Sequence, residues 1–171
     1  FEFKENEKFI SIEPSENSLK IDFQLVYSNN VIGRQRNKIN FSDKDLSNVY
    51  TSRTFCLFED VKKIKKIGLA KGGSLDNAIV VKDNEILNSS GLRNSKEFVN
   101  HKILDLAGDF LLSGYRILGN ITCVQGGHNL SNLFLRAFLK DRSNYSIIEV
   151  DESESIKSYF KTTVSKIAVN A

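Results

Sequence analysis

The sequence predicts an α+β fold, a two-layer sandwich in which a mixed, mainly antiparallel sheet carries helices on one face. Three observations lead to this class. Near the start of the chain, the stretches 8–14 and 19–27 alternate apolar and polar residues, as half-buried strands do. A helical period of apolar residues dominates 98–112, and strands and helices alternate from there to about residue 150. Because helices separate strands that must share one sheet, the pattern favours a two-layer α+β sandwich.

The composition fits one globular domain. The chain has 171 residues, of which 40% are hydrophobic and 26% charged, enough to build a core. Its net charge of +3, from 24 Lys and Arg against 21 Asp and Glu, is too small to indicate nucleic-acid binding. No apolar run approaches the ~20 residues that a membrane span requires. We therefore expect neither a nucleic-acid partner nor a membrane span.

Two further features bear on processing and compartment. The chain lacks Met and begins with Phe1, so we expect a processed chain or a piece of a longer one. Cys56 and Cys123 form no CxxC pair and no metal-ligand cluster. Such cysteines favour a reducing, cytoplasmic compartment, with a disulfide between them as the alternative.

The elements of the first third follow in order. A turn at Asn17–Ser18 separates the first two strands, and a third short strand is predicted around Ile39. Ser42 stands at an N-cap position before acidic residues, which predicts a short helix running toward Tyr50. A second helix is predicted at 58–67, because its apolar residues lie on one side. Its lysines indicate a solvated face more than a phosphate site.

The middle of the chain holds the strongest helix. A glycine-rich segment first leads into two short strands, at 78–81 and 86–87. The helix at 98–112 follows, and Asn94 with Glu97 predicts a capping box at its start.

The last part alternates again. We expect a strand at 117–124, a helix that begins just after His128, and a strand at 145–150. The tail, 151–171, is polar and then weakly amphipathic around 156–167, which predicts a loosely attached helix.

The long helix carries two different faces. His101, Asp105 and Asp109 follow one another at intervals of four, so they form a row opposite the apolar stripe. The same side carries Phe98, Leu112 and a glycine instead of long charged side chains, which predicts a second buried surface. Such a row is usually a solvated face, whereas buried carboxylates beside a histidine require pairing or a metal. The residues alone leave both interpretations open. The apolar stripe consists of Val99, Ile103, Leu106 and Phe110.

These residue types point to specific chemistry. A His and an Asp one helical turn apart, as His101 and Asp105 are, can bind a single metal ion. Two ligands fall short of a catalytic zinc site, which has three plus water. The other histidine, His128, follows Gly126 and Gly127 at a predicted helix start, where it suits a general acid or an oxyanion-stabilising group. The alternative for this segment is a tight turn capped by a polar residue.

Four motifs together carry a family resemblance. They are "SRTF" at 52–55, "GLAKGGSLDNAIVV" at 68–81, "HKILDLAGD" at 101–109 and "GGH" at 126–128. In this order and spacing they closely resemble the second domain of the zinc-dependent UDP-3-O-acyl-N-acetylglucosamine deacetylases. These enzymes commit a sugar nucleotide to lipid A synthesis in Gram-negative bacteria.

The resemblance covers roughly 18–150 and implies a domain plan. In that family two similar α+β domains face each other through their helical layers, with the active site between them. Residues 1–150 then form the second domain, with a small βαβ insert at about 68–92. The tail at 151–171 matches nothing in the family pattern.

The resemblance also implies roles for the site residues. His101 and Asp105 resemble two of three ligands of a zinc ion, a site type that tolerates iron as well. Asp109 and His128 resemble the hydrogen-bonded pair beside the metal, whose imidazole stabilises the oxyanion or protonates the leaving amine. Thr54 resembles the hydroxyl group that helps hold the tetrahedral intermediate. The implied reaction is metal-assisted hydrolysis of an acetamide.

The implied substrate is UDP-3-O-acyl-N-acetylglucosamine. Lys102 resembles the lysine that contacts the nucleotide portion, and Phe55 resembles an aromatic residue lining the substrate channel. The glycine-rich insert resembles a βαβ unit that forms an apolar passage for the acyl chain. Its lining positions correspond to Val61, Ala70, Gly73, Ser74 and Ala78.

The sequence departs from the family at one point. The third zinc ligand, a histidine, and the general base, a glutamate, come from the first domain, and no region here resembles that domain. We therefore expect the chain alone to bind zinc weakly and to release no detectable acetate. The alternative is a non-catalytic nucleotide- or acyl-binding module, or an isolated inactive domain, of the same fold. The presence of all four polar residues, His101, Asp105, Asp109 and His128, favours the enzyme, since a binding module would not need all of them.

Overall fold

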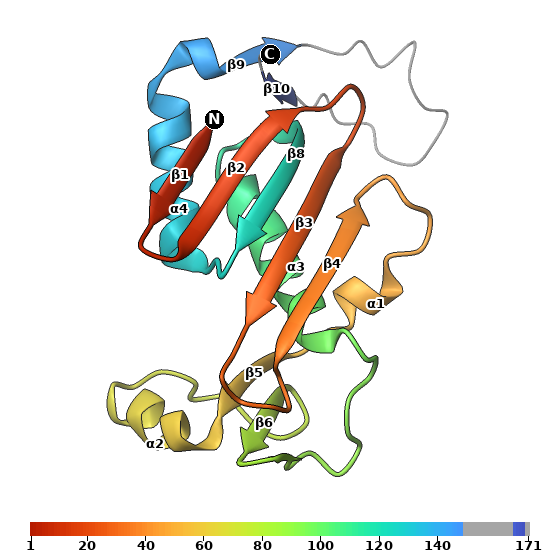
Figure 1. Cartoon of the computed structure of the whole chain (residues 1–171), viewed down its shortest axis with the longest axis vertical. Coiled ribbons are helices and arrows are strands. Elements are labelled where there is room, and N and C mark those ends of the chain that lie inside the picture. The colour runs from red at the N-terminus through yellow and green to blue at the C-terminus, as the bar shows by residue number, and fades with distance from the viewer. Residues whose placement is uncertain (149–165, 170–171) are drawn as a thin grey trace.

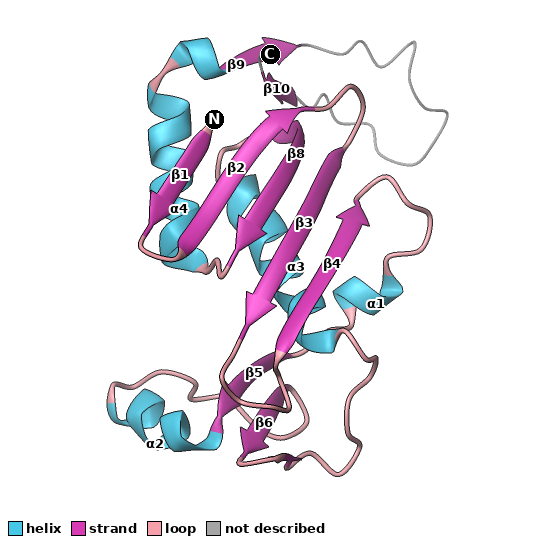
Figure 2. Cartoon of the chain, viewed as in Figure 1, coloured by secondary structure: helices cyan, strands magenta, loops and turns pink. Residues whose placement is uncertain are grey.

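The computed structural model describes residues 1–148 and 166–169 and confirms the predicted α+β class. Figure 1 shows a large sheet with helices behind it and a smaller unit below, and Figure 2 separates the helices from the strands by colour. Within the described residues, every helix is too short or too polar to cross a lipid bilayer. Cys56 and Cys123 are both free thiols, as expected.

The large sheet is mixed and mainly antiparallel, with β8 at its centre. β8 pairs antiparallel with β2 and parallel with β3 and β10, while β1–β2, β3–β4 and β9–β10 are antiparallel pairs. Alternate side chains along β3 are buried, which matches the period-two pattern of the sequence, whereas in β2 Ser11 is buried together with Ile10 and Ile12. The strands are β1 (Glu2–Glu5), β2 (Lys8–Pro14), β3 (Leu19–Val26), β4 (Arg34–Asn40), β8 (Arg116–Val124), β9 (Tyr145–Ile148) and β10 (Lys166–Val169).

Two helices lie behind this sheet (Figure 1), α3 (Glu97–Leu111) and α4 (His128–Lys140), and the short helix α1 (Ser47–Tyr50) packs against α3. A short 3₁₀ turn, Arg142–Asn144, follows α4. The predicted apolar stripe of α3 is fully buried against the sheet, so its opposite side faces away from the core. Phenylalanines fill the layer between α3 and α4, where the rings of Phe110 and Phe134 stack with centroids 5.5 Å apart.

The smaller unit is a βαβ insert with its own three-stranded sheet. β5 (Thr54–Leu57) and β6 (Ala78–Lys82) are parallel, with α2 (Phe58–Lys66) as the crossover, and β7 (Glu85–Ile86) pairs antiparallel with β6. The unit therefore begins earlier than the predicted bounds of about 68–92, because β5 and α2 belong to it.

Several local predictions are wrong at element ends. Ser42 caps no helix: its backbone N–H bonds to Asn40, and the first turn of α1 instead bonds to Asp45. The capping box is absent because the Glu97 side chain is drawn into another contact, described below, although Asn94 does accept a hydrogen bond from the N–H of Lys96.

Both ends of the described chain also differ from expectation. The four-residue strand β1 was not predicted, because its alternation is too short to be distinguished from a loop. In the tail, 166–167 belong to strand β10 and not to a helix. The rest of the predicted tail helix, like 149–150 of the predicted last strand, lies outside the described residues.

Candidate active site

The predicted polar row lies along the side of α3 that faces away from the sheet. The Nε2 atom of His101 and the Oδ1 atom of Asp105 are 3.3 Å apart, and both side chains are 16% exposed. Asp109, one turn further on, is 14% exposed. The row is therefore half-buried, and its first two members, His101 and Asp105, contact each other, unlike residues on a freely solvated helix face.

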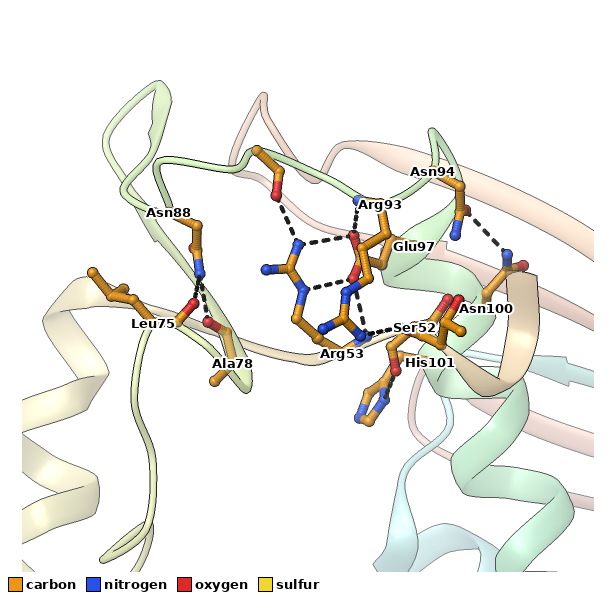
Figure 3. A network of polar contacts seen from close by, with 12 residues as sticks. Ser52, Arg53, Leu75, Ala78, Asn88, Arg93, Asn94, Glu97, Asn100 and His101 are labelled. Carbon is orange, nitrogen blue, oxygen red and sulfur yellow. Dashed lines mark hydrogen bonds and ion pairs between the residues drawn. The ribbon is translucent and has the colours of Figure 1, made fainter. Parts of the chain in front are cut away.

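The orientation of the His101 ring is set by a backbone oxygen. Its Nδ1 atom lies 3.3 Å from the carbonyl oxygen of Ser52, the residue that follows α1 by two positions (Figure 3). A carbonyl oxygen and a carboxylate oxygen both only accept, so the single proton of the neutral ring lies either on Nδ1, bonded to Ser52, or on Nε2, bonded to Asp105. Burial lowers the pKa of His101, although the nearby Asp105 charge acts in the opposite direction.

His128 joins the row from the other helix. It is the first residue of α4, and its Nδ1 lies 2.8 Å and 3.0 Å from the two carboxylate oxygens of Asp109. Its Nε2 lies 4.0 Å from Asp105, and the side chain is 70% exposed. The ring is therefore held at one nitrogen while the other points toward the His101–Asp105 pair.

Gly126, two residues before the start of α4, lies where a side chain would not fit. A Cβ atom on Gly126 would lie 2.4 Å from the Sγ atom of Cys123, closer than packed atoms can approach. The absence of a side chain lets α4 begin directly against β8, which brings His128 to Asp109.

Lys102 contacts the row and also lines a cavity. Its Nζ atom lies 2.7 Å from Asp105 Oδ2. It borders a cavity of about 370 Å³ that is also lined by Lys8, Tyr27 and Gln125. Two lysines at one cavity make it suitable for an anionic group.

Thr54 and Phe55 lie on β5, next to the row. Thr54 is exposed and opens the strand two residues after Ser52. The Phe55 ring packs edge-on against Phe98, at 5.0 Å between centroids, and against His101, at 6.3 Å. This aromatic contact joins the insert to the start of α3.

The five predicted lining residues of the insert surround one apolar cavity of about 360 Å³. Side chains of α2 and β6 form its walls, and the loop between them closes one side. Such a cavity can take an extended hydrocarbon chain. The five are Val61, Ala70, Gly73, Ser74 and Ala78, joined by Cys56, Phe58, Ile64, Lys65, Leu75, Val80 and Leu87.

The donor set fits a metal ion in part. The 3.3 Å between His101 Nε2 and Asp105 Oδ1 allows both atoms to bind one ion at the ~2.0–2.2 Å usual for zinc. Within 1–148 and 166–169, however, no three His, Cys, Asp or Glu side chains come together as a complete metal-binding group. The described residues thus offer two candidate ligands and not a full site.

The predicted second buried surface on α3 is only half correct. Phe98 is fully buried, but Leu112 is 75% exposed and Gly108 is exposed. The sequence pattern could not distinguish the two, because an apolar residue on the outer face of a helix is buried only where another element covers it.

Sequence reasoning missed four residues that build or border the site. Lys8 was read only as the start of a strand, and the pairing of Arg53 with Glu97 spans 44 positions. Asn88, 4% exposed, binds the carbonyl oxygens of Leu75 and Ala78 and so fixes the cavity wall (Figure 3). A lone asparagine or glutamate gives no signal of this kind in a sequence.

Comparison with known proteins gives the class of this fold and site. The family model of UDP-3-O-acyl N-acetylglycosamine deacetylase matches residues 1–140. The UDP-3-O-acyl-N-acetylglucosamine deacetylase of Campylobacter hominis is 43% identical over 88% of this chain and 51% of its own length. Those of Campylobacter jejuni subsp. doylei and Aliarcobacter butzleri are 40% and 37% identical over 94% and 95% of this chain, and 54% of their own lengths.

The relatives that match this chain are thus UDP-sugar deacetylases by name. The chain belongs to the UDP-3-O-acyl N-acetylglycosamine deacetylase family. It spans about half the length of the curated relatives it matches. The resemblance expected from the four motifs is confirmed.

Proposed function

We propose that this chain provides one half of the active site of a metal-dependent deacetylase, acting in lipid A synthesis in the cytoplasm. The substrate is UDP-3-O-acyl-N-acetylglucosamine, and the reaction is hydrolysis of its acetamide with release of acetate. His101 and Asp105 are two of the three ligands of the metal, zinc or iron. The other half of the enzyme supplies the third ligand and the general base.

One observation carries the proposal. Two helices separated by strand β8 bring an imidazole–carboxylate pair, His101–Asp105, next to a second such pair, His128–Asp109. The first pair presents a ring nitrogen and a carboxylate oxygen 3.3 Å apart. The second pair presents His128 Nε2 within 4.0 Å of Asp105, while Asp109 holds the ring at Nδ1. A metal-assisted amide hydrolysis needs these two functions side by side.

Each residue then has a defined part in the reaction. When bound, the metal polarises the acetamide carbonyl and activates a water molecule. His128 stabilises the negative charge that develops on the carbonyl oxygen, or protonates the leaving amine, while Asp109 fixes its ring. Thr54 adds a hydroxyl donor to the oxyanion. Lys102 offsets the charge of the nucleotide phosphates.

The acyl chain is assigned to the insert. The cavity lined by Val61, Ala78 and their neighbours is apolar, and Phe55 lies between it and His101. A 3-O-acyl chain extending from the sugar can pass along Phe55 and leave water for this cavity, which is favourable by ~0.8 kcal/mol for each methylene buried.

The exposed side of the helical layer supports the need for another half. Tyr50, Leu111 and Leu112 are 61%, 65% and 75% exposed, and Leu111 lines an apolar hollow with Leu104 and Ala107. Contiguous exposed apolar surface of this kind is typical of an interaction site. We assign it to the domain that completes the active site.

The test is reconstitution of the enzyme. This chain is mixed with the part of the Campylobacter hominis deacetylase that the match leaves uncovered, and acetate release from the substrate is measured with and without a chelator. We expect release that the chelator abolishes and zinc restores. The chain alone is expected to release none.

The control is the matched half of the same Campylobacter hominis enzyme mixed with its own other half. If that mixture is active and the mixture with this chain is not, the proposal is wrong. Binding of a fatty acid by the chain without any acetate release in the mixture would support the non-catalytic module instead.

A further inference from the structure

Two oppositely charged side chains, Arg53 and Glu97, lie buried beside the candidate active site. Glu97 is fully buried and Arg53 is 6% exposed. The Nε of Arg53 donates to Glu97 Oε1 at 2.9 Å, and Nη2 donates to Oε2 at 3.2 Å. The backbone N–H groups of Arg53 and Arg93 also donate to this carboxylate, at 3.1 Å and 2.6 Å. Both carboxylate oxygens are thus fully engaged.

The pair joins three segments of the chain. Arg53 lies just before β5, Glu97 is the first residue of α3, and Nη2 of Arg53 also donates to the carbonyl oxygen of Gly91 at 2.7 Å. Figure 3 shows the guanidinium group between the insert and the start of the helix, with the His101 ring close below. The pair therefore fixes the insert and β5 relative to the first turn of α3.

Its position connects it to the candidate metal ligand. Arg53 is flanked by Ser52, whose carbonyl oxygen lies 3.3 Å from His101 Nδ1, and by Thr54. Ser52 is held on its other side by bonds from its N–H to Val49 and from its hydroxyl to Asn48. The Ser52 peptide is thus restrained by α1 on one side and by the ion pair of Arg53 on the other.

Stability alone does not account for the pair. Removing two charges from water is unfavourable, and their attraction inside a protein commonly fails to offset it. A comparable forked pair exists on the surface, where Arg36 binds Asp22 through Nε and Nη2 at 2.7 Å each and is 65% exposed. The surface pair contacts no candidate site residue, whereas the buried pair sets the peptide that orients His101.

We propose that Arg53 and Glu97 are positioning residues for the proposed reaction. Through the Ser52 carbonyl they hold His101 in the tautomer with the proton on Nδ1, which leaves Nε2 free to bind the metal. This inference rests on the proposed function, because the tautomer matters only if His101 binds a metal, but the tautomer can be measured whether or not that function is correct. The tautomer is a property of the metal-free chain.

The first experiment reads the tautomer directly. Long-range ¹H–¹⁵N NMR of the metal-free chain, at a pH where imidazoles are neutral, separates the protonated from the bare ring nitrogen. The chain has two histidines, so a His128→Gln variant assigns both. We expect His101 with its proton on Nδ1. A proton on Nε2 in the unsubstituted chain overturns the inference without any further variant.

The second experiment compares Arg53→Lys and Glu97→Gln with Arg36→Lys. Lysine keeps the positive charge but cannot make the two parallel hydrogen bonds of the guanidinium group, and glutamine keeps the shape of glutamate but has one acceptor oxygen fewer. In the two buried variants we expect a mixture of His101 tautomers and about tenfold weaker zinc binding, the usual size of an effect on a ligand's hydrogen-bond partner. Arg36→Lys is expected to change neither.

The outcomes separate the inference from the proposed function. Folded buried variants with a lower melting temperature but an unchanged tautomer and zinc affinity would show a purely structural pair. Zinc that fails to shift the His101 resonances of the unsubstituted chain, even in the reconstituted mixture, would instead contradict the proposed function and leave the tautomer result standing.

Discussion

The helical site and the insert hold their residues by different means. On α3 and α4, single atoms are aimed by polar contacts: Ser52 orients His101, and Asp109 orients His128. In the insert, apolar side chains surround a cavity of about 360 Å³, and the Asn88 side chain holds the cavity wall through hydrogen bonds with the backbone of Leu75 and Val80. Chemistry depends on where individual lone pairs point, whereas recognition of a hydrocarbon chain depends on volume. Substitutions should therefore separate the two properties.

The largest separation is expected at Asp109. Replacing Asp109 by Asn keeps the shape of the side chain but removes the charge that holds the His128 ring. We expect kcat of the reconstituted enzyme to fall about 10²-fold, the usual size for a general acid or oxyanion donor, with zinc affinity unchanged. Steady-state kinetics and a zinc titration measure the two, and Asp22→Asn on β3 is the control. An equal loss of zinc affinity would mean that Asp109 acts as a ligand.

A smaller effect, which depends on the length of the acyl chain, is expected in the insert. Ala78→Leu adds three carbons to the cavity wall, where overpacking costs about 1–3 kcal/mol. We expect kcat/KM for a long-chain acyl substrate to fall about tenfold and that for a short-chain substrate to stay the same. Asp76→Ala, on the loop before β6 and outside the cavity lining, is the control. An equal fall in kcat/KM for both substrates would show that the acyl chain does not bind in this cavity.

The connection between the two regions was the part that the sequence could not predict. The row on α3 could be predicted because helical periodicity is local, and the family motifs located the lining of the insert. The capping box at Asn94 and Glu97 was wrong for the opposite reason. A glutamate three residues after a predicted N-cap suits a capping box, but here a guanidinium 44 positions away and two backbone N–H groups bind its carboxylate instead.

Strand pairing shows the same limit. The alternation at β2 and β3 is long enough to be recognised, whereas β1 has four residues and depends on its partner β2. Residues 166–167, predicted as part of a helix, instead join β10 between β8 and β9. Short segments take the conformation that their neighbours in space impose, and for β10 one of those neighbours, β8, is far away in the sequence.

The smallest expected effect concerns acid stability at this connection. Burial raises the pKa of Glu97, but hydrogen bonds from the Arg53 side chain and from two backbone N–H groups outweigh it, so the pKa lies below the usual 4.5. The unfolded chain then binds the proton more readily, so the stability that the pair contributes is present above about pH 4.5 and is lost as the pH falls through the lowered pKa.

Melting temperatures between pH 6 and pH 3 measure this loss. We expect Glu97→Gln to be less stable at pH 6 and to lose less on acidification than the unsubstituted chain. Asp22→Asn should change the curve less, because its partner Arg36 is largely exposed. Parallel curves for Glu97→Gln and the unsubstituted chain would show that the carboxylate charge contributes nothing.

The most direct test of the account is the metal content of the complex between this chain and the other half of the enzyme. Elemental analysis after dialysis is compared for the unsubstituted chain, His101→Ala, Asp105→Ala and the surface control Asp22→Ala. We predict a single bound metal ion in the unsubstituted and control complexes and its loss in both ligand variants, with acetate release lowered at least ~10³-fold, as the loss of several kcal/mol of transition-state stabilisation requires. Full metal content in His101→Ala would contradict the claim that α3 holds the metal.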